Sequence, residues 1–235
     1  MELWSVESGK LISFIPDLEG INSSPFVISP DNKWLILGDK KGKINFWSIE
    51  KKKIIMREEI SKEVINKMRF FDKDKLLIAS GKKIYLRNIN EAKNIKVFNV
   101  KSSPIHQIVS SPNKKSFLTL SQDSLLNIWT IHQDKPLYSL DIKNTYADMG
   151  KVVDFSSNAK EVIIGYEDGS LKLYSTDNLK EPKKIFVFGD KKNWVVFDEE
   201  KKKMTIADEG SFLLKKQQVY KDENVTIFEF ERYEK

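Results

Sequence analysis

The chain has 235 residues, of which 40% are hydrophobic and 31% are charged, and its formal net charge is +6. It contains no cysteine, which excludes disulfides, thiol nucleophiles and thiolate metal sites. It also contains no apolar run of about eighteen residues, so no transmembrane helix is expected. The first residues, MELWSVESGK, combine neither a basic leader nor a long apolar core, and we therefore expect no secretory signal and a cytoplasmic protein.

The positive charge comes mainly from lysine. Of the 40 basic residues, only Arg57, Arg69, Arg87 and Arg232 are arginine. Arginine is the better partner for phosphate and guanine, because its planar fork can form two parallel hydrogen bonds. The lysines recur in nearly every turn and are mixed with 34 acidic residues. The charge pattern therefore favours a solvated, lysine-rich surface over a stripe that binds nucleic acid.

In chain order, one arrangement of short apolar runs and polar turns recurs. Residues 29–47, SPDNKWLILGDKKGKINFW, match residues 111–129, SPNKKSFLTLSQDSLLNIW, in length and in the order of their parts. The first turn of each unit occurs five times, as SPDNK at 29, FDKDK at 71, SPNKK at 111, SSNAK at 156 and DEEKK at 198. The steps between them are 42, 40, 45 and 42 residues. Periods of about 20 to 50 residues are typical of repeat architectures.

Each unit predicts four strands, a to d. The nearly continuous apolar runs PFVISP and KVVDFS suit an inner strand a that is covered on both faces. Strand b follows the first turn, and a second turn about ten residues later precedes strand c. Strand c closes on an aromatic or apolar residue, which is Trp47, Leu86, Trp129 or Tyr174. Four short strands in each period indicate a blade of a β-propeller.

These units resemble WD40 repeats, and the resemblance covers nearly the whole chain. The stretch LEGINSSPFVISPDNKWLILGDKKGKINFWSIE follows the order of that family's unit, from the connection into strand a to the tryptophan of strand c. The spacing matches well, but the signature dipeptides match poorly. Gly20-Ile21 stands where the family often has Gly-His, and Ser48 and Thr130 follow the tryptophans in place of Asp.

The same resemblance assigns structural residues. Asp123 and Asp168 match the family's aspartate in the turn between strands b and c, whereas Lys41 occupies that place in the first complete unit. The family's hydrogen-bonded set of His, Ser or Thr, Trp and Asp is therefore not expected to be complete in any unit. We expect packing to hold the blades together, with structural roles for Trp4, Trp47, Trp129 and Tyr174.

The predicted fold class is all-β, a WD40-like β-propeller domain over 1–235 with four-stranded antiparallel blades, about five to six in this chain. The expected units are a half blade at 1–18, blades at 21–60, 64–100, 104–142 and 150–188, and an irregular closing blade at 193–235. Trp4 precedes Trp47 by one period, so the sequence opens within a blade. Either the first strands join the last ones and close five blades, or the ring needs further strands and has about seven, which we slightly favour.

No residue pattern indicates catalysis. The two histidines, His106 and His132, occupy unrelated places and are expected to be structural or solvent-facing. The sequence has no metal-binding or phosphate-binding motif, so we expect neither a metal nor a cofactor. Acidic pairs such as Asp72 with Asp74 fall in turns, where aspartate is common. We therefore expect a protein that is not an enzyme.

In the WD40 family, partners commonly dock on the face formed by the d-to-a and b-to-c loops. Carried onto this chain, the resemblance places there Asn22, Lys40, Lys41, Lys62, Lys82, Lys83, Lys101, Gln122, Tyr146, Glu167 and Lys191. These loops are basic. We therefore expect an interaction scaffold that binds an acidic protein or peptide segment; the alternative is that the lysines only solvate the turns.

Two other functions stay open at this point. The chain could be the C-terminal regulatory or sensor portion of a larger enzyme, because NWVVFDEEKKKMTIADEGSF weakly resembles the ends of bacterial WD40 regions joined to peptidase-like domains. Nucleic-acid binding ranks last, since aromatic residues such as Phe46 and Phe117 fall inside predicted strands instead of loops. The sequence does not indicate an oligomeric state, and no membrane partner is expected.

Overall fold

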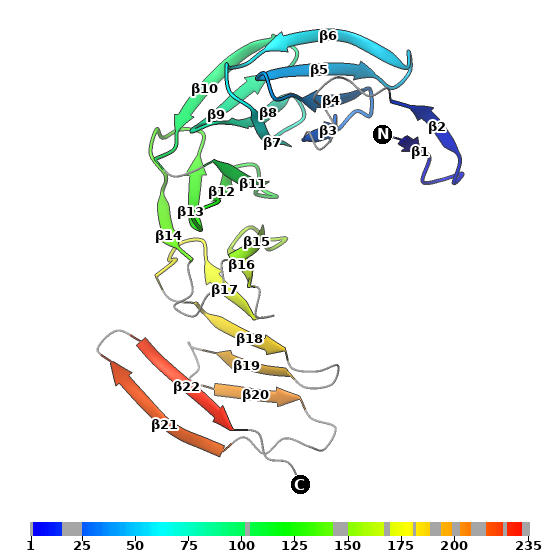
Figure 1. Ribbon diagram of the computed structural model, residues 1–235. Helices are drawn as coiled ribbons and strands as arrows, with labels where there is room; N and C mark the ends of the chain where they lie inside the picture. The colour runs from blue at the N-terminus through cyan, green and yellow to red at the C-terminus, as the bar shows by residue number, and fades with distance from the viewer. Residues whose placement is uncertain are drawn as a thin grey trace.

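The chain forms an open series of β-sheets. The computed structural model describes residues 2–15, 25–101, 104–142, 150–166, 170–180, 182–188, 194–198, 203–207, 215–222 and 225–231. Over these ranges it contains 22 strands and no helix. The sheets follow one another in chain order along an arc (Figure 1). The expected all-β class is confirmed.

Three consecutive sheets each consist of four antiparallel strands that pair in chain order, and we call these strands a to d. Sheet 1 contains β3 (Phe26–Ile28), β4 (Trp34–Gly38), β5 (Lys43–Ser48) and β6 (Lys53–Glu59). Sheet 2 contains β7 (Ile65–Phe70), β8 (Lys75–Ser80), β9 (Lys83–Asn88) and β10 (Lys93–Asn99). Sheet 3 contains β11 (Ile105–Ser110), β12 (Ser116–Ser121), β13 (Leu125–Thr130) and β14 (Tyr138–Asp141). The predicted four-stranded antiparallel blade is confirmed.

The two ends of the arc differ from its middle. At the start, β1 (Glu2–Trp4) and β2 (Leu11–Phe14) form a two-stranded half sheet. Sheet 4 follows sheet 3 and contains β15 (Gly150–Phe155), β16 (Glu161–Tyr166), β17 (Leu171–Ser175) and β18 (Lys184–Phe188). It continues without a break into β19 (Trp194–Asp198) and β20 (Lys203–Ala207), while β21 (Lys215–Asp222) and β22 (Val225–Glu231) form a separate hairpin.

The last segment therefore departs from the expected closing blade at 193–235. Strand β19 pairs antiparallel with β18, with Val196 opposite Phe186. A strand d has a free outer edge, and an antiparallel hairpin can add to it by backbone hydrogen bonds alone. In the described residues this pairing produces a six-stranded sheet in place of a further separate blade.

The middle strands of each blade are covered on both faces. Residues 35–38 of β4 and 44–48 of β5 are all buried, whereas most of β6 is exposed. Continuous burial is expected where sheets stack face to face, and strand d lies at the outer edge of such a stack. The apolar runs recognised in the sequence thus form the contacts between neighbouring sheets.

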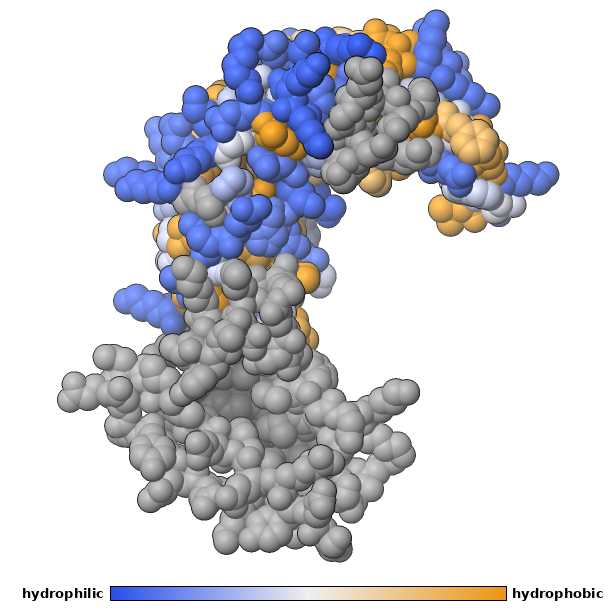
Figure 2. Space-filling view, viewed as in Figure 1, coloured by the Kyte–Doolittle hydropathy of each residue, from blue (hydrophilic) through white to orange (hydrophobic). Residues whose placement is uncertain are grey.

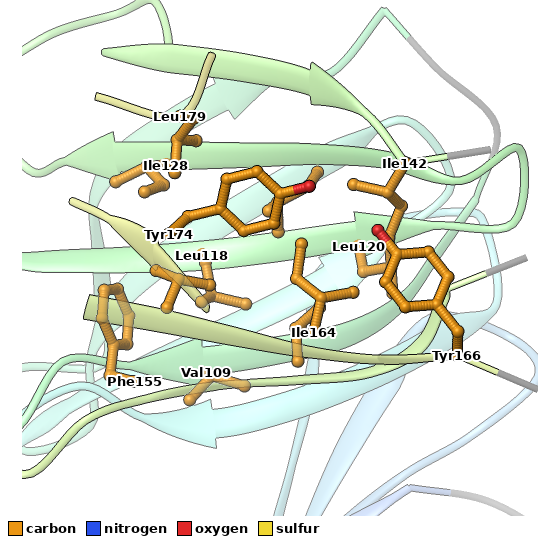
Figure 3. Close-up of a cluster of buried hydrophobic side chains, with 13 residues drawn as sticks. Val109, Leu118, Leu120, Ile128, Ile142, Phe155, Ile164, Tyr166, Tyr174 and Leu179 are labelled. Atoms are coloured by element: carbon orange, nitrogen blue, oxygen red, sulfur yellow. The ribbon is translucent and has the colours of Figure 1, made fainter. Parts of the chain in front are cut away.

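The described core consists of four hydrophobic clusters, and each joins two consecutive sheets. The half sheet and sheet 1 meet through Leu3 and Trp47, for example. Between sheets 3 and 4, Val109 and Ile128 face Ile164 and Tyr174 (Figure 3). Full burial of one such side chain contributes about 1.5–3 kcal/mol. Packing of this kind holds each sheet to its neighbours.

The turns between strands a and b share one set of hydrogen bonds in sheets 1, 3 and 4. Ser29 Oγ accepts a hydrogen bond from the Trp34 N–H at 2.9 Å and donates one to Asp31 Oδ1 at 2.6 Å. The serines that begin the turns of sheets 3 and 4 do the same. The hydrogen bond from Ser29 is the main cause that lowers the pKa of Asp31. The recurrence of serine in the sequence is thus explained by its role in the turn.

Ala92 has a left-handed backbone in the turn between strands c and d of sheet 2, with φ of 51° and an exposed side chain. This conformation is unfavourable for alanine but not for glycine. We expect Ala92→Gly to raise the free energy of unfolding by about 0.5–1 kcal/mol, measured by urea denaturation. Lys51, a turn residue whose φ is not positive, is the control. Lys51→Gly should lower stability, and a loss in both variants would contradict the expectation.

Candidate functional site

The b-to-c turns and the d-to-a connections are hydrogen-bonded to one another at one end of the sheets. The N–H of Ile60 donates to the carbonyl of Gly42, that of Val100 to Lys82 and that of Ile142 to Ser124, at 2.9, 2.8 and 2.9 Å. Each acceptor precedes its donor by eighteen positions. The three bonds repeat the same closure in sheets 1, 2 and 3. Turn and connection therefore form one continuous rim.

Gly42 allows the two segments of this rim to approach closely. Its φ is 78°, and a Cβ at this position would lie 2.3 Å from the carbonyl oxygen of Ser61. No L side chain fits at that distance, and the left-handed backbone also favours glycine. The glycine in DKKG is therefore required by the contact between the turn and the following connection.

The described basic residues that were expected on this face all lie on the rim and are exposed. They are Lys40, Lys41, Lys62, Lys82, Lys83 and Lys101, and we call them the lysine rim. Gln122 is also exposed, in the b-to-c turn of sheet 3. Hydrophilic side chains cover much of the visible surface of sheets 1 to 3, while hydrophobic ones gather toward the half sheet (Figure 2). The structure thus brings together the lysines of sheets 1 and 2.

Most of these lysines have no acidic partner among the described residues. Lys62 pairs with Glu59 at 2.5 Å, and this contact lowers the pKa of Glu59. The ion pairs of the described chain do not include the other five members of the lysine rim. In the turn of sheet 1, Asp39 Oδ1 instead accepts hydrogen bonds from the backbone N–H groups of Lys41 and Lys43, both at 2.8 Å. The lysine ammonium groups therefore face solvent.

Several predicted positions lie outside the described residues. They are Asn22, Tyr146, Glu167, Lys191 and the turn residue Asp168. Their place relative to the lysine rim stays a prediction from the resemblance. Asp123 is described: its carboxylate accepts a hydrogen bond from the Ser121 hydroxyl within the b-to-c turn of sheet 3.

The predicted structural aromatic residues lie in different surroundings. Trp47 and Trp129 are fully buried and Tyr174 nearly so, and burial raises the pKa of Tyr174. Trp4 is 54% exposed, because its neighbour Leu3 packs against sheet 1 and Trp4 lies on the opposite face of the half sheet, against which no described sheet packs. Its Nε1 donates to Glu2 Oε2 at 2.9 Å. Trp4 thus occupies the strand c position of a sheet that is only partly covered.

Sheet 3 contains a hydrogen bond between Trp and Thr, two members of the hydrogen-bonded set of His, Ser or Thr, Trp and Asp that is usual in WD40 repeats. Trp129 Nε1 donates to Thr119 Oγ1 at 2.9 Å, and both groups are buried. In sheet 1 the register places Leu37 where Thr119 stands in sheet 3. Leucine offers no acceptor, and Trp47 Nε1 has no hydrogen-bond partner among the described residues. The two tryptophans are therefore equally buried, but of their two indole N–H groups only that of Trp129 donates a hydrogen bond to a described residue.

Arg87 forms a contact between sheets that the sequence reasoning missed. It stands on β9, and its guanidinium pairs with the carboxylate of Glu58 on β6 of sheet 1. The two side chains are only 10% and 13% exposed. The structure places Arg87 itself at the strand c position of Trp47 and Trp129, since each is the fifth residue of its strand c. The sequence prediction of Leu86 at this position was therefore wrong by one residue.

Other kinds of site receive no support from the described residues. Across the described ranges, no three His, Asp or Glu side chains gather in a group that could hold a metal ion. His106 lies on β11 and His132 in the turn after β13. No helix in this part of the chain is long and apolar enough to cross a membrane.

Comparisons with known proteins identify the fold. No protein-family model matches the sequence, and no curated protein matches it. Among solved structures, 1523 chains match, which shows that the architecture is widespread. One is the crystal structure of the β-propeller domain of Cps50 (Swd1) from Myceliophteria thermophila, with a TM-score of 0.57 and 13% identity over 78% of this chain and 70% of that one. At this identity the likeness concerns the fold alone, and the chain has the fold of a WD40-like β-propeller.

Proposed function

We propose that the chain is a non-catalytic interaction scaffold that binds an acidic segment of a partner protein on the lysine rim. One observation carries the proposal: Lys40, Lys41, Lys82, Lys83 and Lys101 are exposed and form no ion pair with a described residue. Propellers in general bind protein partners through loops that rigid strands hold in place.

The repeat geometry supports an extended ligand. Lys40 and Lys41 lie in the b-to-c turn of sheet 1, whereas Lys82 ends the b-to-c turn of sheet 2 and Lys83 begins β9. Neighbouring sheets therefore each present a pair of charges at the same end of the strands. One surface ion pair contributes only about 0–1 kcal/mol. Several pairs made at once to one acidic segment would add to a measurable affinity, mainly by faster association at low salt.

Charge reversal tests this proposal. The variant Lys40→Glu, Lys41→Glu, Lys82→Glu, Lys83→Glu should bind a fluorescein-labelled poly-glutamate peptide at least about tenfold more weakly than the unaltered chain, because four attractions become repulsions. Binding to the unaltered chain should weaken steeply with salt. Fluorescence anisotropy at several salt concentrations measures both effects.

A matched control variant has the same net charge as the charge-reversal variant. The variant Lys51→Glu, Lys52→Glu, Lys53→Glu, Lys135→Glu changes four exposed lysines at the other end of the sheets. It should retain most of the affinity. Equal loss in both variants would mean that net charge alone attracts the peptide, and absence of binding to the unaltered chain would leave the lysines as turn residues that only contact water; either result overturns the proposal.

A further inference from the structure

A groove of about 480 Å³ lies at the end of the sheets opposite the lysine rim. It is formed where the inner strands β3, β7 and β11 end and their a-to-b turns begin. Ile28, Phe70 and Ser110 line it from equivalent places, because they pair with Leu35, Leu76 and Phe117, the second residues of their strands b. Three consecutive sheets thus contribute the same position of the repeat to one groove. Its volume is in the usual range of ligand sites.

One wall of the groove is apolar and accessible. Phe26 and Ile28 are 52% and 43% exposed, although they belong to an inner strand. They pair with Leu37 and Leu35, which face the half sheet. The half sheet supplies no described strand a or b to cover them. The exposed part of this wall is therefore free to pack against an apolar side chain of a ligand.

The other side of the groove carries two cations. Arg69 and Lys114 are exposed, and neither forms an ion pair with a described residue. Asp72, in the neighbouring turn, is paired with Lys75 at 3.4 Å. Lys114 stands at a left-handed position of its turn, with φ of 56°. The turn thus presents a positive charge at the mouth of the groove.

The groove is held in shape without a ligand. Ser110 Oγ donates to the carbonyl oxygen of Phe70 at 2.8 Å, which ties the end of β11 to the end of β7. Both residues line the groove. A preformed site reduces the conformational entropy that the protein would otherwise lose on binding.

We propose that this groove binds an extended peptide segment in which one large apolar side chain is flanked by glutamates or aspartates. The apolar side chain packs on Phe26 and Ile28, and the carboxylates pair with Arg69 and Lys114. The site is independent of the lysine rim, since it lies at the other end of the strands.

The apolar wall favours a peptide over a nucleic acid. A nucleic-acid strand requires a track of cations and flat aromatic or guanidinium surfaces on which bases stack. Phe26 and Arg69 offer flat surfaces, but the residues that line the groove include just two cations, Arg69 and Lys114, which do not make a track. Val27 and Ile28 beside them have branched aliphatic side chains that suit Phe, Leu or Ile.

A defined peptide tests the proposal with the full chain. The probe is a short fluorescein-labelled peptide with one phenylalanine between glutamates, and fluorescence anisotropy gives its affinity. Arg69→Gln with Lys114→Gln should weaken binding at least about tenfold, since hydrogen bonds to charged groups are lost. Phe26→Ala should weaken it severalfold without unfolding the chain, because this side chain is half exposed. A probe with glycine in place of phenylalanine should also bind severalfold more weakly.

The control variant is Lys33→Gln with Lys73→Gln, which removes the same charge from a-to-b turns whose lysines do not line this groove. It should bind the probe as the unaltered chain does, and circular dichroism should show the same fold for all variants. Equal loss in the control, equal affinity for the glycine probe, or absence of saturable binding would overturn the proposal. Displacement of the peptide by a mixed-sequence single-stranded DNA at equal or lower concentration would overturn it in favour of nucleic acid.

Discussion

Replacing Trp129 by alanine is expected to lower the free energy of unfolding by about 3–5 kcal/mol. The indole is stacked on Phe117, with ring centroids 6.1 Å apart and planes 7° apart. It also meets the edge of Phe98 at 5.6 Å and donates its hydrogen bond to Thr119. The substitution would leave a cavity between sheets 2 and 3 and a buried threonine hydroxyl without its donor. Urea denaturation followed by far-ultraviolet circular dichroism measures the loss.

Trp4→Ala is the matched control for Trp129→Ala. Both residues close a strand c, but Trp4 is 54% exposed and sits at the end of the stack. Its truncation removes less buried surface and should reduce stability by about 1 kcal/mol or less. Similar losses in the two variants would contradict the difference in burial between the two tryptophans.

The second large effect is expected at the contact between Arg87 and Glu58. Arg87 also donates to the carbonyl of Ala92 at 2.6 Å and to Asn94 Oδ1 at 3.2 Å. Arg87→Met should lower the free energy of unfolding by about 3 kcal/mol, because the Glu58 carboxylate would keep its mostly buried position without a counter-charge. The double variant Arg87→Met, Glu58→Leu should recover a large part of that loss, since two apolar side chains need no charge compensation.

A double-mutant cycle, measured by urea denaturation, separates the coupling energy between Arg87 and Glu58 from the effects of their other contacts. The control is Lys93→Met, which removes the exposed pair of Lys93 and Glu91, whose side chains are 67% and 52% exposed. This change should alter stability by no more than about 0.5 kcal/mol. If the double variant were as unstable as Arg87→Met alone, Glu58 would contribute nothing to the effect of Arg87, and an uncompensated buried carboxylate would not be the cause of the loss.

Most of the architecture was predictable because its determinants are local. The turns that begin at Ser29, Ser111 and Ser156 are built from side chains within five positions of one another, so the sequence alone reveals them. Apolar runs of fixed length between such turns then predict the strands and the four-stranded sheets. The exposure of the lysines in the b-to-c turns follows from the same local pattern.

The remaining features depend on contacts between sheets. The pair of Arg87 and Glu58 requires the relative placement of sheets 1 and 2, which no local pattern indicates. The pairing of β19 with β18 likewise depends on contacts between segments. The hairpin of β19 and β20 would have the same sequence in a separate blade as at the edge of sheet 4, so the sequence does not distinguish the two arrangements. Phe26 and Ile28 are apolar residues of the kind expected in a strand a. They are exposed because the neighbouring half sheet has no described strand a or b to cover them.

The division of the core into four clusters, each shared by two adjacent sheets, has a thermodynamic consequence. Such a chain approximates a one-dimensional array with nearest-neighbour coupling, so its free energy is close to a sum of terms for individual sheets and for the junctions between them. A sheet in the interior is stabilised by two junctions, and a terminal sheet by one. Melting would therefore begin at the termini and advance inward, and sheets 2 and 3 would be the last to lose their protected amide protons.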